Sequence, residues 1–409
     1  MQTNFNLDNF ISQYVTGRPE SLLKADFEKF NTELNNRING RKVLVIGGAG
    51  TIGSSYIRAI LRFKIAKLVV VDINENGLTE LVRDLRSSLG YHIPDDFITY
   101  PVNFGDRVFS KIFEAHGPFD IVANFAAHKH VRSEKDIFSI EAMIENNVLK
   151  ARKLLDMLLE NPPEHFFCVS TDKAANPVNI MGASKKLMEE LIMAYADRLP
   201  IKTARFANVA FSNGSLPLGF LDRLQRQQPW SCPLGIRRFF VSPQESGEIC
   251  LMASIMGESG DIFYPQLDEE KDMIPFDRIA IDLLHTLGYE PDICKSEEEA
   301  KEKAVLISQG KGDAGKYPIF FFGSDTSGEK SFEEFFTEEE QLDEETFIKL
   351  GVVKNSKKRN IAEIDEIFKQ METLFESGNI TKKEIVDILK VYLPNFEHIE
   401  TGKGLDSKM

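Results

Sequence analysis

The sequence predicts an α/β protein whose core is a doubly wound parallel sheet. Between residues 42 and 206, six short apolar runs alternate with stretches of helical periodicity. Strands that are apolar on both faces, with helices between them, indicate a parallel sheet covered on both sides. The first apolar run leads directly into a glycine-rich turn, which is typical of the first strand of such a sheet.

The predicted elements fall into four regions. Residues 1–40 form an N-terminal helical extension, residues 41–215 contain the sheet, and residues 351–409 form a C-terminal helical extension. Residues 216–350 form a smaller α/β region, because the alternation fades there into helices with short strands or loops. The predicted strands are Lys42–Ile46, Lys67–Val71, Phe97–Val102, Asp120–Phe125, His165–Val169 and Ile201–Phe206. The weaker segments are the terminal helices Leu7–Val15, Ser21–Ile38 and two in 361–393, and the short strands or loops Cys232–Ser242, Gly260–Gln266 and Tyr317–Gly323.

Composition and charge exclude several classes of protein. The 409 residues are 42% hydrophobic and 27% charged, with a formal net charge of −14. The acid excess argues against a nucleic-acid binder or a polybasic membrane anchor, because phosphate contacts need clustered Lys and Arg. The chain has no apolar run of membrane-spanning length, no secretory signal, and no cysteine pattern typical of zinc. We therefore expect a cytoplasmic protein without a metal site, and a solvated face for the acidic run Ser331–Thr346.

The turn after the first predicted strand has the composition of a dinucleotide-binding loop. Its glycines in GGAGTIG have the spacing G-x-x-G-x-x-G, which permits a tight turn and lets backbone N–H groups reach a pyrophosphate. Asp72 ends the second strand, where a carboxylate accepts from ribose hydroxyls and disfavours NADP. The alternatives are a plain tight turn, a strand-end cap at Asp72, and an ordinary loop carboxylate at Asp106. We expect NAD, with cofactor-binding residues Gly47, Gly50, Thr51, Ile52, Gly53, Asp72 and Asp106.

Ionisable residues gather after the fifth predicted strand. Thr171, Asp172 and Lys173 follow that strand, at the edge of the sheet where open α/β proteins bind ligands. Met181 and Lys185 come next, four residues apart and so on one face of a helix. A solvated turn is the alternative interpretation of the Asp-Lys pair, but it leaves the glycine loop and Lys185 unexplained.

These motifs resemble the extended short-chain dehydrogenase/reductases, and specifically the UDP-N-acetylglucosamine 4,6-dehydratase family of bacterial polysaccharide and flagellin-sugar biosynthesis. The block STDKAANPVNIMGASK at 170–185 is the most specific match. The resemblance spans about residues 41–335 and implies a Rossmann-type NAD-binding domain over 41–215 and a substrate-binding region over 216–350. The other matching stretches are GGAGTIG, AAHKHV, ENNV, RFANV, SNGS and SGEK at 327–330.

The resemblance implies a redox-neutral lyase reaction on a UDP-sugar. NAD⁺ takes hydride from carbon 4 of the sugar, water leaves across carbons 5 and 6, and the hydride returns to carbon 6. By the family pattern, Lys173 removes the carbon-5 proton, Asp172 protonates the leaving 6-hydroxyl, and Thr171 hydrogen-bonds the 4-hydroxyl. The resemblance also implies that Lys185 holds the nicotinamide ribose and that Ala126 lies against the cofactor. A homo-oligomer is also expected. The expected substrate-binding residues are Lys129, His130, Asn147, Asn208, Ser215 and Arg238.

The chain departs from the family pattern at several positions. Met181 stands where most short-chain dehydrogenases have Tyr, so the base for the 4-hydroxyl is open among Lys185, Asp172 and a water relay. Our hypothesis is that Thr171 and Lys185 replace the Tyr and that Met181 is packing. Other departures are Arg132 in place of Pro, and Asn213 and Thr326-Ser327 in place of arginine-containing elements, for which Arg238 compensates in part.

Three other functions compete with this interpretation. A dehydratase that releases a 5,6-alkene and an epimerase would both use the same fold. The third is a non-enzymatic NAD-binding regulatory protein that has lost the Tyr. Joint retention of Asp172, Lys173 and Lys185 argues against this last interpretation.

Overall fold

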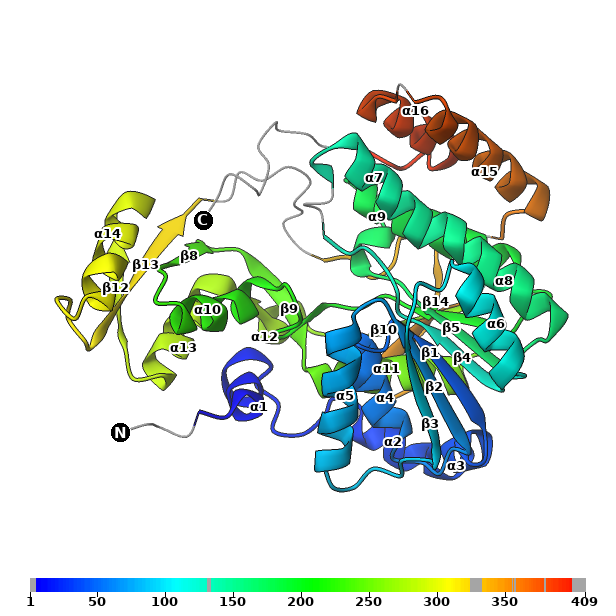
Figure 1. Ribbon diagram of the computed structural model, residues 1–409, viewed down its shortest axis with the longest axis horizontal. Helices are drawn as coiled ribbons and strands as arrows, with labels where there is room; N and C mark the ends of the chain where they lie inside the picture. Colours follow the sequence, from blue (N-terminus) through cyan, green and yellow to red (C-terminus); the bar gives the residue numbers. More distant parts are fainter. Residues whose placement is uncertain are drawn as a thin grey trace.

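The computed structural model describes residues 5–130, 134–323, 333–354, 356, 358–378 and 380–398, and its body is a large twisted sheet between layers of helices (Figure 1). Within these residues, nine strands form this sheet in the order β14-β15-β10-β6-β5-β4-β1-β2-β3. Its strands are β1 Lys42–Ile46, β2 Lys67–Asp72, β3 Asp96–Pro101, β4 Ile121–Asn124, β5 His165–Val169, β6 Ile201–Ala204, β10 Asp261–Pro265, β14 Gln341–Asp343 and β15 Leu350–Lys354.

The strand order confirms the predicted doubly wound parallel sheet. From the centre of the sheet, β1, β2 and β3 follow one another outward on one side, and β4, β5 and β6 on the other. All six strands are parallel. The central strands β4 and β5 are buried along their whole length, as their mainly apolar sequences predict. The direction of winding reverses between β1 and β4, and such a point is where open α/β sheets bind ligands.

Helices cover both faces of the sheet (Figure 1). On one face, α11 Pro243–Met256 packs against α4 Thr51–Ile60, and a Cβ at Gly247 would lie 2.2 Å from the carbonyl oxygen of Ser55. Glycine therefore lets these two helices approach closely. The other helices of this body are α5 Glu75–Ser87, α6 Arg107–His116, α7 Ile137–Ile144, the π-helical turn η3 Glu145–Leu149, α8 Lys150–Glu160, the 3₁₀ turn η4 Asp172–Ala174 and α9 Ile180–Ala194.

The main sheet extends beyond the region from which it was predicted. Strand β10 pairs in parallel with β6, and β15 and β14 continue the sheet in antiparallel pairing. The segment Gly260–Gln266, expected as a short strand or loop, forms β10 of the main sheet, and all five residues of β10 are buried there. A single apolar strand has no local signal that tells it which sheet it joins.

The smaller region forms two short sheets beside the main body (Figure 1). One sheet has the order β11-β9-β7, and the other is the parallel sheet β12-β13-β8, in which helix α14 connects β12 to β13. Its elements are β7 Asn208–Val209, α10 Leu216–Gln225, β8 Trp230–Pro233, β9 Arg237–Val241, α12 Glu269–Asp272, β11 Met273–Pro275, α13 Phe276–Thr286, β12 Glu290–Cys294, α14 Glu297–Ser308 and β13 Lys316–Phe322.

The N-terminal segment contacts both parts of the molecule. Helix α1 Leu7–Phe10 continues as the π-helical turn Ile11–Val15, whose apolar side chains join the core of the smaller region. The predicted helix Ser21–Ile38 is broken near Phe30 into α2 Lys24–Lys29 and α3 Asn31–Ile38, which pack on the main body.

At the C-terminal end, α15 Ile361–Glu376 and α16 Lys382–Tyr392 confirm the two predicted amphipathic helices. They lie outside α8 and α9 (Figure 1), where Arg152 on α8 pairs with Asp365 on α15 at 2.8 Å. All four cysteines are buried and free. Across the described ranges, no helix combines the length and hydropathy that crossing a membrane requires.

Candidate active site

The strand register brings the predicted site motifs to one edge of the sheet. Ile46 of β1 is level with Val71 of β2 and with Asn124 of β4, and Asn124 is level with Cys168 of β5. The residues that follow these strands therefore share the carboxyl edge. They are the glycine loop, Asp72, Ala126 and the Thr171–Lys173 turn.

The glycine loop forms a cradle that larger residues would fill. Gly47 has φ +77°, and a Cβ there would lie 2.6 Å from the Ala126 nitrogen. A Cβ at Gly53 would lie 2.2 Å from the Gly47 carbonyl oxygen. Gly50 caps α4 without a side-chain hydrogen bond, so the first N–H groups of this helix keep their capacity to bind an anion. The cradle fits a pyrophosphate.

Asp72 is bonded directly to this loop. Its Oδ2 accepts from the Ala49 nitrogen at 2.9 Å and its Oδ1 from the Asn74 nitrogen at 2.9 Å. The carboxylate is only partly buried, so it retains lone pairs for ribose hydroxyls. Asp106 is exposed at the N-terminus of α6, where its side chain makes no capping hydrogen bond. Thr51 is beside a second loop, because its Oγ1 accepts from the Asn213 nitrogen at 2.9 Å.

The turn after β5 holds a compact polar cluster. The buried Asp172 accepts a hydrogen bond at Oδ1 from Thr171 Oγ1, 2.7 Å away. Both of its oxygens lie 3.2 Å from Nζ of Lys173, which is half-buried. A carboxyl and an amine on adjacent residues can serve as proton donor and proton acceptor on one ligand.

Helix α9 places Met181 and Lys185 beneath this turn. Both side chains are buried. Lys185 Nζ donates to the Val169 carbonyl oxygen at 2.7 Å, and burial, the main cause, lowers the pKa of its amine. Thr171 donates to Asp172, so Thr171 and Lys185 have different hydrogen-bond partners in this structure. The hypothesis that these two residues replace the missing Tyr stays a prediction.

Asn147 braces the site from the middle of a helix. It lies in the π-helical turn between α7 and α8, a distortion that is frequent at functional sites. Its Oδ1 accepts from the His128 nitrogen at 2.8 Å, and its Nδ2 donates to the His128 oxygen at 3.0 Å and to Ser184 Oγ at 3.1 Å. Asn147 therefore ties the segment after β4 to helix α9.

The other predicted substrate-binding residues lie on two sides of the turn. Lys129 and His130 are exposed, and His130 is close enough to Gly214 for a Cβ there to meet its ring at 3.0 Å. Ser215 caps α10 with a 3.4 Å bond from the Leu218 nitrogen to its hydroxyl. Arg238 and Asn208, from β9 and β7, converge on a carboxyl that the motif search did not single out.

That carboxyl belongs to Glu333. Asn208 Nδ2 donates to it at 2.6 Å, the Phe239 nitrogen donates at 3.3 Å, and Arg238 Nε lies 3.4 Å away. Burial and the Asp172 carboxylate raise the pKa of Glu333 to about 7, against the opposing charges of Arg238 and Lys173. The expectation of a solvated acidic face is therefore wrong at this residue, which is 7% exposed.

A second acid of the same run is also held inside the protein. The Glu340 carboxylate accepts from Arg205 at 2.9 and 3.0 Å. Arg205 is completely buried and also makes two bonds to Glu189 on α9, at 2.8 and 2.9 Å. The run thus packs on the helix that carries Met181 and Lys185. The sequence does contain one indication of this pair. Arg205, in the motif RFANV, lies at the end of an otherwise apolar strand, where a buried arginine needs an acidic partner such as Glu340.

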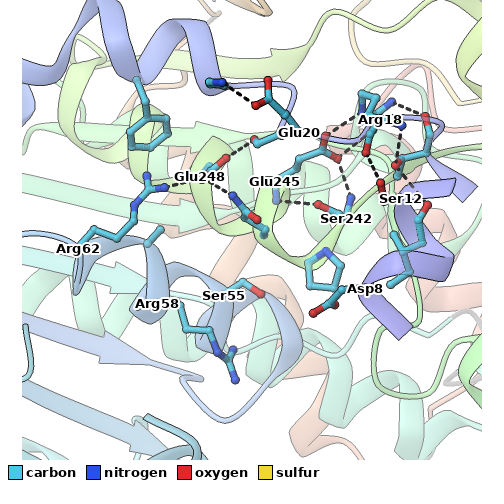
Figure 2. Close-up of a pocket in the computed structure, with 18 of the residues that line it drawn as sticks. Asp8, Ser12, Arg18, Glu20, Ser55, Arg58, Arg62, Ser242, Glu245 and Glu248 are labelled. Carbon is cyan, nitrogen blue, oxygen red and sulfur yellow. Dashed lines mark hydrogen bonds and ion pairs between the residues drawn. The ribbon is translucent and has the colours of Figure 1, made fainter. Parts of the chain in front are cut away.

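A large cleft of about 1330 Å³ lies elsewhere, between the N-terminal segment, α4 and α11 (Figure 2). Its lining residues include none of the glycine loop and none of the Thr171–Lys185 motif. Within it, Arg18 bonds to Glu245 at 2.8 and 2.9 Å, Arg62 pairs with Glu248 at 2.7 Å, and Arg58 pairs with Asp84 at 2.7 Å. These opposite charges neutralise one another, and the carboxyl edge of the sheet remains the candidate active site.

Comparison with known proteins identifies the family of this chain. The model of the family described as "Polysaccharide biosynthesis protein" matches residues 43–355. The chain belongs to this family. The resemblance drawn from the motifs is confirmed at the level of the family, and the matched range contains every predicted site residue.

Two curated relatives and one solved structure illustrate the similarity. The chain is 27% identical over 328 residues to the probable polysaccharide biosynthesis protein EpsC of Bacillus subtilis, covering 79% of this chain and 49% of EpsC, so it spans about half of that relative. It is 28% identical over 243 residues to the UDP-N-acetylglucosamine 4,6-dehydratase (inverting) of Campylobacter jejuni, and the match covers 57% of this chain and 69% of that protein. The crystal structure of DesIV, the dTDP-glucose 4,6-dehydratase of Streptomyces venezuelae, has NAD bound, as expected for this fold. DesIV is 18% identical to this chain with a TM-score of 0.52, and the match covers 72% of this chain and 88% of DesIV.

Proposed function

We propose that this protein is an NAD-dependent nucleotide-sugar 4,6-dehydratase acting on UDP-N-acetylglucosamine. The observation that carries the proposal is the buried Asp172 carboxyl paired with Lys173 at the same sheet edge as the glycine cradle. A reversible oxidation at carbon 4 needs a dinucleotide, and loss of water needs an acid and a base at neighbouring carbons. This edge has residues for both.

The cradle at Gly47–Gly53 would hold the pyrophosphate of NAD, and Asp72 the adenosine ribose. When bound, NAD⁺ supplies the oxidant for carbon 4, and its reduced form supplies the reductant for carbon 6. Lys185, buried in α9, would hold the nicotinamide ribose. Its lowered pKa also makes it a candidate acceptor for the proton of the 4-hydroxyl.

The elimination is assigned to the Asp-Lys pair. Once carbon 4 is a ketone, the proton on carbon 5 becomes acidic, and Lys173 takes it. Asp172 gives a proton to the 6-hydroxyl, which leaves as water, while the electrons of the broken carbon–hydrogen bond form the 5,6 double bond. When the hydride returns to carbon 6, carbon 5 needs a proton, and Lys173 would give its proton back there, while Asp172 regains a proton from the solvent. Thr171, bonded to Asp172 at 2.7 Å, would orient the carboxyl.

The experiment is product analysis with the purified protein in deuterated water. A 4,6-dehydratase gives a product lighter by one water, with a carbon-6 methyl group and deuterium at carbon 5. Release of a 5,6-alkene would leave vinylic signals instead of the methyl, and an epimerase would leave the mass unchanged apart from deuterium. The assay is run on a panel of UDP-, dTDP-, GDP- and CMP-sugars, and the sugar nucleotides that are converted identify the nucleotide of the substrate. Absence of turnover on the whole panel would refute the enzyme assignment.

The site assignment has its own variant. Lys173→Ala should lower turnover by about 10²–10⁴, the usual contribution of a positioned proton carrier, and leave NAD content unchanged. Lys153→Ala removes an exposed lysine of α8 and serves as the matched control. Near wild-type turnover of Lys173→Ala would contradict the assignment.

A further inference from the structure

We propose that Glu134 is a positioning residue for the start of helix α9, and that the C-terminal segment that ends at His398 holds Glu134 in place. Helix α9 carries Met181 and Lys185 of the candidate active site. The inference deepens the proposed function, and its effect on turnover rests on that function.

The Glu134 carboxyl binds the first turn of α9 directly. Its Oε1 accepts from the Met181 backbone nitrogen at 2.9 Å, and its side chain is only 9% exposed, so water competes little for this bond. The first turn of α9 contains no acidic residue of its own. A carboxylate beside a helix N-terminus is favourable, because the first N–H groups lack partners within the helix and carry partial positive charge. Glu134 therefore supplies this charge from another segment of the chain.

The backbone that Glu134 binds is packed against the turn that carries Lys173. A Cβ at Gly182 would lie 2.7 Å from the Lys173 carbonyl oxygen, so the two backbones are in contact there. The Met181 carbonyl oxygen accepts from Ser184 Oγ at 2.7 Å, which fixes the same turn of the helix from within. A displacement of this turn would therefore move Lys173. A misplacement of about 1 Å at an active site can cost about 10²-fold in rate.

The other oxygen of the Glu134 carboxyl faces the C-terminal segment. Its Oε2 lies 3.6 Å from Nε2 of His398, whose side chain is 10% exposed. Two buried side chains, Leu393 and Phe396, anchor this segment, and the rings of Phe396 and His398 pack with their centroids 5.9 Å apart. Packing therefore keeps the imidazole of His398 beside Glu134.

The C-terminal helices also hold a later turn of α9. Arg359, which precedes α15, bonds to Glu190 on α9 and to the Tyr392 carbonyl oxygen at the end of α16. The C-terminal extension thus supports α9 at Glu190 and, through Glu134, at its first turn. Arg359, Tyr392 and His398 all lie beyond the range 43–355 that the family model matches. The support of α9 from this side is therefore a property of this chain's extension.

The direct test is hydrogen–deuterium exchange of the Met181 amide in the full chain without substrate. Glu134→Ala removes the acceptor, so this amide should exchange roughly three- to tenfold faster, the factor that corresponds to one lost hydrogen bond. Glu134→Gln keeps an acceptor oxygen and should restore most of the protection. His398→Ala should give a smaller increase in the same direction, and it keeps the test decisive if Glu134→Ala does not fold. Glu397→Ala, at an exposed neighbour, is the matched control.

Unchanged exchange in Glu134→Ala, or an effect of His398→Ala no larger than that of the control, would overturn the proposal. So would a Glu134→Gln protein that exchanges as fast as Glu134→Ala. The exchange measurement needs no turnover, so it decides the role of Glu134 even if the protein converts no nucleotide sugar and the proposed function fails.

The functional test separates kcat from KM. Because the substrate contacts stay in place while Lys173 is displaced, Glu134→Ala should lower kcat about tenfold with little change of KM. Glu134→Gln should recover most of this loss, and Glu397→Ala should behave as wild type. An increase of KM at constant kcat, or a Glu134→Gln protein as slow as Glu134→Ala, would contradict the positioning role.

Discussion

Replacing Arg205 with Met should cost about 3–5 kcal/mol of folding free energy at neutral pH, the range for breaking a buried ion pair by removing one partner. Arg205 is 0% exposed and Glu189 1%, and two bonds of 2.8 and 2.9 Å join them. Met fills most of the aliphatic volume, so the loss comes mainly from the stranded carboxylate. Glu340 is 15% exposed in its side chain and can turn to water, so it contributes less.

The pH dependence of this loss has a definite sign. Burial opposes ionisation of Glu189, but the Arg205 guanidinium and Lys186 hold the pKa of that carboxyl below its ordinary value. A carboxyl with a lowered pKa stabilises the fold above the ordinary carboxyl range, and this stabilisation is lost as the pH falls. The difference between wild type and Arg205→Met should therefore narrow between pH 7 and pH 4.

Urea unfolding followed by circular dichroism measures both effects. Arg83→Met, which breaks an exposed pair with Glu80, is the matched control and should change the free energy by less than about 0.5 kcal/mol. Adding Glu189→Leu to Arg205→Met should recover most of the loss, because an apolar replacement of both partners removes the buried charge. A loss as small as that of the control, or one that does not change with pH, would refute this reasoning.

Three further variants test the site. Met181→Leu should keep most activity, since a swap between apolar side chains of similar volume costs little, and a large loss of turnover would give Met181 a direct role. Lys185→Ala should abolish oxidation at carbon 4, measured as hydride transfer in a single turnover, whereas a full rate would move the base to Asp172 or water. Gly53→Ala should lose bound NAD, measured after denaturation, because its Cβ would lie 2.2 Å from the Gly47 oxygen; wild-type NAD content would exclude this steric argument.

Local patterns were sufficient for the first half of the chain. Parallel strands such as β1 and β5 are apolar after their first residue, and the predicted bounds Lys42–Ile46 and His165–Val169 agree with the structure. Since the carboxyl ends of parallel strands share an edge, motif order alone also placed Asp72 beside the glycine loop, where its 2.9 Å bond to Ala49 now lies.

Pairs of residues that are far apart in the chain could not be predicted from the sequence. Glu333 and Glu340 look like solvent-exposed acids, and only tertiary structure brings them to Arg238 and Arg205. Strand β10 was separated from the sheet for the same reason, because its partner β6 lies far back in the chain. Buried charges are expensive without a partner, so each of these acids is explained only when its partner is known.

The path of the N-terminal segment limits how far the two parts of the protein can move apart. One end is buried through Phe10, whose ring packs edge-on against Phe211 at 5.8 Å, and the other end is buried through α3 on the main body. Between them, Arg18 spans the two sides, with bonds to Glu245 on α11 and to Asp272 at 3.1 Å beside β11. An extended chain covers at most about 3.3–3.6 Å per residue. The short segment between Phe10 and α3 therefore limits the distance between the two parts. Moving the smaller region away from the main body would therefore require the Arg18 bonds to Glu245 and Asp272 to break.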